Sequence, residues 1–160
     1  MDIFGLSNIQ IDGWMRRLCD RYQGTFSCNN IPFSLCNKTG SLIVNLAPWG
    51  SVGTHFISIL LDHDCVYYID SLGGKCENSD IKEFLIACNR PVYYQEIAMQ
   101  SSDSAYCGFY SMLIVTTYEM EKKWTNPFNE KNDKIEKNDA KCLVLLSRNM
   151  YMLRNRKMDP

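Results

Sequence analysis

The stretch MQSSDSAYCGFYSM, from Met99 to Met112, decides how this chain folds and what chemistry it offers. A short polar run leads to Cys107, and an apolar segment with helical spacing follows. We therefore expect a largely buried helix that begins near Ser104 and ends near Glu121, with Cys107 in its first turn. The unpaired N–H groups and the dipole of a helix N-terminus favour a thiolate. Cys107 is accordingly the candidate nucleophile.

The composition describes an ordinary folded chain. With 160 residues, 46% of them apolar, and a net charge of −1, we expect one domain spanning residues 1–160. This charge gives no global reason to expect nucleic acid or acidic lipid as the main partner, and the basic cluster from Arg148 to Lys157 is typical of a solvated tail. Every apolar run is far shorter than the roughly 20 residues of a membrane span. We expect a soluble monomer without membrane contact.

Eight cysteines raise the question of a metal site or a disulfide framework. The chain has no Cys-x-x-Cys pair and only two histidines, and its N-terminus lacks the basic-then-apolar run of a signal peptide. Neither a zinc site nor a secreted disulfide scaffold is favoured. We expect no metal and no required cofactor, and most cysteines should be small buried residues in a reducing intracellular compartment.

Apolar periodicity and turn residues outline the other elements. Helices are predicted over 7–22, over 81–88 with a cap at Ser79 or Asp80, and over 140–153 at the C-terminus. A polar, Asn- and Lys-rich loop is predicted over 125–139. Strands are predicted over 24–28, 42–46, 54–61, 65–70 and 91–97.

The two strands 54–61 and 65–70 read as a hairpin, and this permits a geometric prediction. If Asp62 and His63 form a two-residue loop, Leu61 pairs with Asp64, and His55 then lies directly opposite Asp70. Opposed residues of an antiparallel pair have Cβ atoms about 4.5–5.5 Å apart and point to the same face. A three-residue loop would make the two diagonal neighbours. In either case the carboxylate is within reach of the imidazole.

Four residues together supply what thiol catalysis of acyl transfer needs. Cys107 would attack the carbonyl, His55 would act as general base and acid, and Asp70 would accept the imidazole N–H. The Gln100 amide and the Cys107 backbone N–H would form the oxyanion hole. Each alone has an ordinary explanation: a core cysteine, a structural histidine, a turn aspartate, a surface glutamine. All four coinciding by chance is improbable. His63, at the hairpin tip, is rejected as the base.

Three segments carry a family resemblance: LIVN at 42–45 with GTHF at 53–56, VYYIDSLG at 66–73, and Gln100 followed after six residues by Cys107-Gly108. Together they resemble the adenain family, the adenovirus-type cysteine endopeptidases, within the wider group that includes SUMO and ubiquitin-like-protein proteases. The resemblance covers roughly residues 5–120. It lies in the chain order His, acid, Gln, Cys and in the Gln-to-Cys spacing.

The resemblance implies an α+β fold, with a central mixed β-sheet flanked by helices and the nucleophile at the N-terminus of a buried helix. It implies hydrolysis of peptide bonds in viral or virus-like structural precursor polypeptides, after small residues such as glycine, in the host nucleus and the virion. Adenovirus enzymes are activated by a disulfide-linked peptide and by DNA. Cys88 lies near the family's linking cysteine but out of register, so an activator peptide and nucleic acid both stay open. Phe56 replaces a common tryptophan, and Asp70 a common glutamate.

Two other functions stay open at this point. A deconjugating protease that removes ubiquitin or a SUMO-like modifier after Gly-Gly would show the same residue order and the same Asp-Ser-Leu motif. An inactive binding module could keep the fold without the chemistry. The small size and the lack of an obvious modifier-docking extension favour the endopeptidase.

Overall fold

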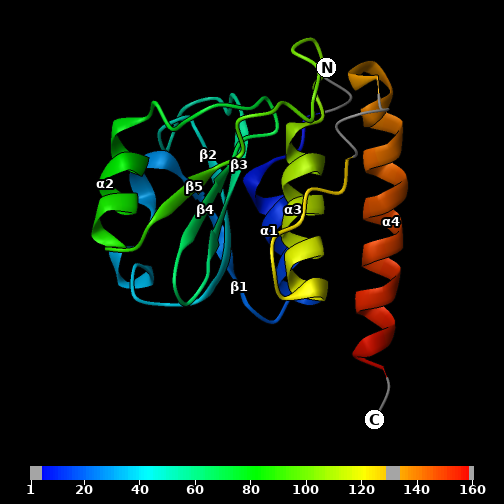
Figure 1. Cartoon of the computed structure of the whole chain (residues 1–160), viewed down its shortest axis with the longest axis horizontal. Coiled ribbons are helices and arrows are strands. Elements are labelled where there is room, and N and C mark those ends of the chain that lie inside the picture. Colours follow the sequence, from blue (N-terminus) through cyan, green and yellow to red (C-terminus); the bar gives the residue numbers. More distant parts are fainter. Residues whose placement is uncertain (1–4, 129–133, 159–160) are drawn as a thin grey trace.

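The computed structural model describes residues 5–128 and 134–158, and Figure 1 shows their arrangement. The expected α+β fold with a mixed sheet is confirmed. The helices are α1 (Asn8–Leu18), α2 (Ser79–Ala87), α3 (Cys107–Glu121) and α4 (Asn138–Arg156). The strands are β1 (Tyr22–Ser27), β2 (Gly40–Asn45), β3 (Phe56–Leu61), β4 (Val66–Ile69) and β5 (Val92–Tyr94). Single 3₁₀ turns are η1 (Cys28–Asn30), η2 (Phe33–Leu35) and η3 (Ile135–Lys137).

The sheet has the strand order β1-β2-β3-β4-β5, and its directions bring one set of strand ends together. The outer pairs β1–β2 and β4–β5 are parallel, while β3 is antiparallel to both of its neighbours. The carboxyl ends of four strands and the amino end of β3 therefore share one edge of the sheet. The residues before β3, after β4 and after β5 meet at this edge, and these are the segments that hold His55, Asp70 and Gln100.

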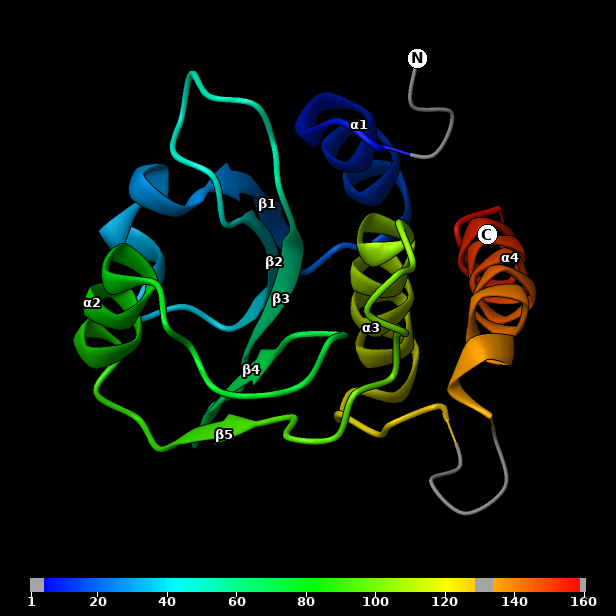
Figure 2. The same cartoon turned by 90° about the horizontal axis from the view of Figure 1, so that it is seen from above.

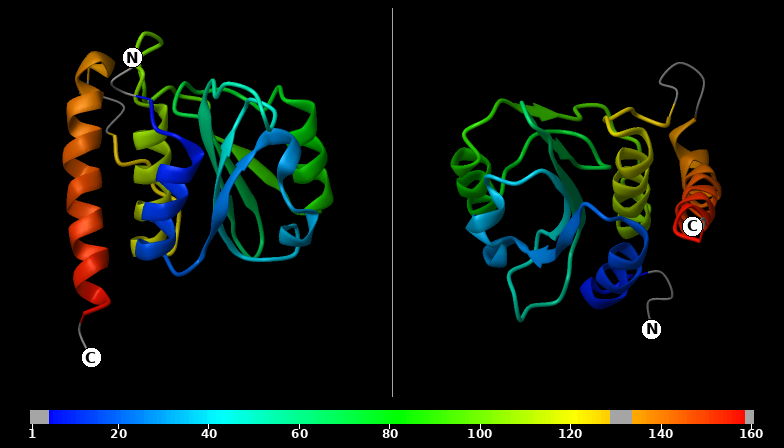
Figure 3. Two further views of the ribbon diagram at one scale, coloured as in Figure 1. Left: turned by 180° about the vertical axis from the view of Figure 1, so that it is seen from behind. Right: turned by 90° about the horizontal axis from the view of Figure 1, so that it is seen from below.

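Helices cover both faces of the sheet. Figures 2 and 3 show α1 and α3 on one face and α2 with η1 and η2 on the other, while α4 lies against the outer side of α3. Alternate residues of β3 enter two separate cores. Phe56 and Leu60 pack with α1 and α3, whereas Ile57 and Ile59 pack toward α2. A strand covered on both faces reads as a continuous apolar run, as β3 does.

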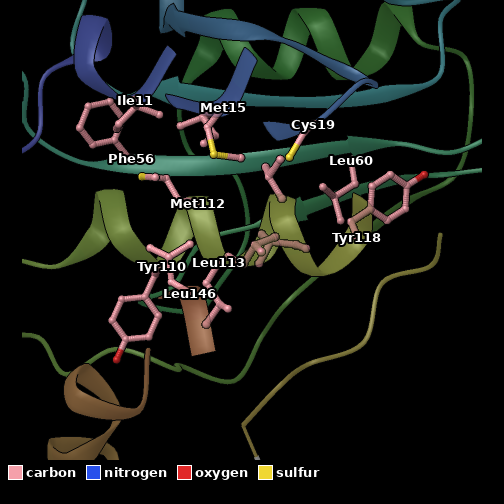
Figure 4. Packing of buried hydrophobic residues seen from close by; sticks show 14 of the residues in the cluster. Ile11, Met15, Cys19, Phe56, Leu60, Tyr110, Met112, Leu113, Tyr118 and Leu146 are labelled. Carbon is pink, nitrogen blue, oxygen red and sulfur yellow. The ribbon is translucent and has the colours of Figure 1, made fainter. Parts of the chain in front are cut away.

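Helix α3 is enclosed on several sides, which is why its sequence is apolar nearly all round. Figure 4 shows Met112, Leu113 and Tyr118 of α3 among side chains of α1 and β3, with Leu146 of α4 beside them. The helix begins at Cys107, three residues later than expected, because Ser104 first closes a turn with Ser101 (N···O 3.0 Å). Within residues 5–128 and 134–158, neither α3 nor any other helix has the length and apolar character needed to span a membrane.

Several boundaries differ from the sequence-based prediction. Helix α1 ends at Leu18 rather than at Tyr22, which begins β1, and β5 covers only Val92–Tyr94 of the predicted 91–97. Helix α2 is capped by Asn78, whose side chain accepts from the Ile81 N–H at 3.1 Å, rather than by Ser79 or Asp80. The predicted polar loop 125–139 includes η3 and the start of α4, and its residues 129–133 lie outside the described residues. Helix α4 extends beyond the expected 140–153 at both ends.

The predicted register of the β3–β4 hairpin was wrong by two positions. Leu61 pairs with Val66, and the Asp62 N–H bonds to the Cys65 carbonyl at 2.9 Å, so the two-residue loop is His63–Asp64. Moving a two-residue loop by one position shifts the pairing by two. His55 is thus a diagonal rather than a direct neighbour of Asp70. Because side chains alternate with a period of two, such a shift keeps both residues on a common side of the hairpin.

Candidate active site

His55 and Asp70 flank the β3–β4 ladder at the shared edge. His55 directly precedes β3, and Asp70 directly follows β4. His55 Nε2 and Asp70 Oδ1 are 2.7 Å apart, and each side chain is 15% exposed. This contact uses Nε2, so it leaves Nδ1 as the nitrogen that can face another partner.

Asp70 is at once the partner of His55 and a turn residue. Its Oδ1 also accepts the Leu72 N–H at 2.8 Å, and its carbonyl accepts the Gly73 N–H at 2.9 Å. An aspartate that bonds the backbone two residues on is typical of such turns. Gly73 has φ +80°, and a Cβ there would lie 2.7 Å from the Glu96 carbonyl oxygen. The turn therefore fixes the Asp70 carboxylate and packs closely against the segment that leads to Gln100.

Cys107, the first residue of α3, lies close enough to His55 for each side chain to shift the pKa of the other. Burial opposes a charged imidazole, but hydrogen bonds to Asp70 and Cys107 and their negative charges outweigh it and raise the pKa of His55 to about 9. Burial also opposes a thiolate, yet the hydrogen bond from His55, the backbone N–H groups of Phe56 and Gly108 and the charge of His55 lower the pKa of Cys107. The two shifts act together, because each favours the charged form of its group and hence a thiolate–imidazolium pair.

Gln100 is 2% exposed and hydrogen-bonded at both ends of its amide, unlike the surface glutamine that an isolated residue would suggest. Its Oε1 accepts from Ser71 Oγ at 2.5 Å, and its Nε2 donates to the Ser104 carbonyl at 2.8 Å and lies 3.2 Å from Ser104 Oγ. Both acceptors of Nε2 belong to one serine. A single N–H can serve two such neighbouring acceptors, so the second N–H remains for another group.

The Gln100 segment is tied to the end of β4 through the backbone. The N–H groups of Met99 and Gln100 both bond to the Ser71 carbonyl at 2.8 Å. Ser71 follows Asp70, and Ser104 stands three residues before Cys107. The Gln100 amide therefore lies between the residue next to the acid and the loop that leads to the thiol.

Several supporting residues escaped the sequence analysis because each acts across a long separation in the chain. Ser104 Oγ and the Tyr110 hydroxyl both donate to Asp139 Oδ1, at 2.9 and 3.0 Å, and Asn138 Nδ2 donates to the Met99 carbonyl at 2.8 Å. Asp139 fell within the predicted polar loop. No spacing in the sequence links it to Ser104, which is 35 positions away.

Asn45 is a further support, at the end of β2. Its Oδ1 accepts from the N–H groups of Ala47 and Thr54, at 2.9 and 3.3 Å. A Cβ at Gly53 would lie 2.5 Å from Asn45 Nδ2, so the loop closes tightly over this side chain. An asparagine within the apolar run 42–46, which predicts a strand, was a signal available in the sequence. It holds the loop that delivers His55.

The remaining cysteines and the second histidine lie elsewhere. His63 is exposed at the hairpin tip, and all eight cysteines are free thiols. Cys88 is buried, and this burial together with the neighbouring Cys36 raises its pKa to about 11. Among the described residues, no group of three or more His, Cys, Asp or Glu side chains is placed to hold a metal ion.

Comparison with known proteins gives a similarity in structure alone. No family model matches the chain, and no curated protein does. Seven chains of solved structures match. One is a crystal structure of selenomethionine-labelled ASFV pS273R protease, at 13% sequence identity and a TM-score of 0.49, over 94% of this chain and 66% of that one. The chain thus spans just under two thirds of the length of that protein.

Proposed function

We propose that this protein is a cysteine endopeptidase that hydrolyses viral or virus-like structural precursor proteins after small residues, glycine above all. One observation carries the reaction type: His55 is bonded through Nε2 to Asp70 and interacts with Cys107, and this interaction lowers the pKa of the thiol. A paired imidazole and a helix-start thiol are the requirements of a thiolate nucleophile. The sequence resemblance to the adenain family supports the substrate class.

The proposed reaction has two halves. The Cys107 thiolate attacks the scissile carbonyl carbon, and the carbonyl oxygen becomes an oxyanion that accepts from the Cys107 backbone N–H and from Gln100 Nε2. The imidazolium of His55 gives its proton to the leaving amine as the C–N bond breaks, leaving a thioester. Water, deprotonated by His55, then attacks the thioester, releasing the carboxylic acid product and restoring the thiolate.

A first experiment tests the nucleophile without any assumption about substrate. We expect Cys107 to be alkylated by iodoacetamide near pH 7 at least about tenfold faster than glutathione, because the thiolate is the reactive form and its pKa is lowered. The alkylated residue is identified by peptide mass spectrometry. Cys65, the other partly exposed cysteine, is the internal control and should react no faster than glutathione. Equal rates at both sites would contradict the proposal and favour an inactive binding module.

A second experiment separates peptide cleavage from modifier removal. The enzyme is incubated with a quenched fluorescent peptide that carries Gly-Gly before the scissile bond, and in parallel with vinyl sulfone derivatives of ubiquitin and SUMO. We expect peptide turnover that is lost in Cys107→Ala and retained in Cys65→Ala. Capture of either modifier without peptide cleavage would replace the endopeptidase with a deconjugating protease.

A further inference from the structure

The Gln100 side chain is held at both ends of its amide. Its Nε2 donates to the Ser104 carbonyl at 2.8 Å, and the neighbouring Ser104 hydroxyl can either reinforce this orientation or oppose it. Ser71 Oγ lies 2.5 Å from Gln100 Oε1, and Gln100 Nε2 lies 3.2 Å from Ser104 Oγ. A serine hydroxyl has one proton to donate, whereas its oxygen can accept two hydrogen bonds. Whether Ser104 Oγ accepts from Gln100 or donates to it is therefore decided by the direction of the Ser104 proton.

The Ser104 hydroxyl proton is donated in a hydrogen bond to Asp139. Ser104 Oγ donates to Asp139 Oδ1 at 2.9 Å, and the Tyr110 hydroxyl donates to the same oxygen at 3.0 Å. A carboxylate only accepts hydrogen bonds, so both hydroxyl protons point to it. With its proton committed, Ser104 Oγ can only accept, and it accepts from Gln100 Nε2 and from the Tyr106 backbone N–H at 3.3 Å.

We propose that Asp139 is a positioning residue, which keeps the Ser104 hydroxyl as an acceptor so that it reinforces, together with the Ser104 carbonyl, the orientation in which Gln100 Nε2, and not Oε1, faces the loop before Cys107. The inference rests on the proposed function, because the orientation matters for catalysis only if an oxyanion forms beside Cys107. The two ends of an amide act oppositely there: the N–H stabilises a negative oxygen, whereas the carbonyl oxygen repels it. Asp139 thus supports the donor orientation of the Gln100 amide, which the Ser104 carbonyl also favours.

The same contacts tie the start of α4 to the site. Asp139 lies in the first turn of α4, and its neighbour Asn138, which is 4% exposed, donates to the Met99 carbonyl at 2.8 Å. Met99, directly before Gln100, and Ser104, four residues after it, are therefore both hydrogen-bonded to the start of α4. The orientation of the Gln100 amide therefore depends on the packing of α4 against α3.

The orientation can be read without any activity. The Gln100 side-chain NH₂ signals in a ¹⁵N–¹H spectrum are assigned by their loss in Gln100→Ala. We expect Asp139→Ala and Ser104→Ala to shift them, since either change removes the relay. Glu136→Gln removes an exposed charge from the same region and should leave them in place. Unmoved Gln100 signals in folded Asp139→Ala or Ser104→Ala would overturn the inference, whatever the enzyme does.

A double-mutant cycle tests the catalytic consequence in the full chain. With the Gly-Gly peptide as substrate, we expect Asp139→Ala to lower kcat about tenfold, with KM changed less than about twofold, because it disturbs one oxyanion donor rather than substrate binding. In the Gln100→Ala background, Asp139→Ala should cost nothing more, since the two residues act through one contact. Independent, multiplying losses would assign Asp139 a merely structural role.

Controls keep the two proposals apart. Asp139→Asn retains an oxygen that can accept from both hydroxyls, so it should recover most of the kcat lost in Asp139→Ala. If Asp139→Ala does not fold, Ser104→Ala breaks the same relay and takes its place in the cycle. If the wild type and Cys107→Ala are equally inactive, the proposed function fails, and the NMR measurement alone decides the orientation of the Gln100 amide.

Discussion

His55 and Asp70 are brought together by a backbone ladder, whereas the arrangement of Gln100 and Cys107 also depends on a network of side chains. The first pair stands at the ends of two hydrogen-bonded strands, so the ladder sets their separation. The second pair is separated by a loop, whose geometry depends on contacts with Ser71, Ser104 and Asp139. A backbone ladder tolerates substitution of most side chains along it. A side-chain network fails when one member is lost, so the two halves of the site should respond differently to mutation.

The largest effect should come from the strand-held half, when the base itself is removed. We expect His55→Ala to lower kcat/KM about 10⁴-fold, the scale of losing a catalytic triad member. The fold should be unaffected in circular dichroism, because the ladder does not depend on this side chain. His63→Ala is the matched control and should stay within twofold of wild type in kinetic assays. Comparable losses in both variants would argue against the assignment of the base.

Removing the amide from the network-held half should cost less. We expect Gln100→Ala to lower kcat by about 10²- to 10³-fold, the usual range for one oxyanion donor. KM should change little, and the rate of Cys107 alkylation should stay high, because the thiolate depends on His55. Steady-state kinetics and iodoacetamide rates measured on the same sample check both. A parallel fall in alkylation would show that Gln100 supports the fold of the loop rather than the oxyanion.

Neutralising the acid should give a smaller loss with a distinctive pH signature. Asp70→Asn keeps an oxygen that can accept from His55 and from the Leu72 N–H but removes the charge. We expect kcat/KM to fall about 10²-fold, at the lower end of acid–base contributions. The alkaline limb of the pH profile should move to lower pH, because Asp70 helps to raise the pKa of His55. An unmoved limb would mean that Asp70 only shapes the turn.

The smallest expected effect needs no mutation. The activity of the wild type should change little across a pH plateau and fall at its ends. The thiolate–imidazolium pair exists above the lowered pKa of Cys107 and below the raised pKa of His55, which is about 9. Activity should therefore fall on the alkaline side near pH 9. The stabilisation from the raised His55 pKa is complete below the unfolded value of 6.5 and is lost as pH rises through about 9. Rates of peptide cleavage and midpoints of thermal unfolding, measured from about pH 5 to about pH 10, test the predicted activity and the predicted stability. An alkaline limb near pH 6.5 would contradict the pairing.

The sequence predicted the strand-held half better than the network-held half, for a physical reason. Strand alternation is strict, so even a register wrong by two left His55 and Asp70 on a common side. The start of α3 was also predictable within three residues, because an apolar helix follows a polar turn. The partners of Gln100 were not predictable. Ser104 and Asp139 are 35 positions apart, and only tertiary packing of α4 brings them into contact.

The enclosure of α3 has a consequence for motion. Eleven of the fifteen residues of the helix are buried, and Cys107 begins it. Segments with dense apolar burial open only in the rarest fluctuations, whereas exposed loops open often. Trp49 and Val52, in the loop before His55, are 74% and 88% exposed. In hydrogen exchange, the amides of α3 should be the slowest and those of this loop the fastest. Accommodation of differently shaped peptides would then come from the loop, around a thiol that stays still.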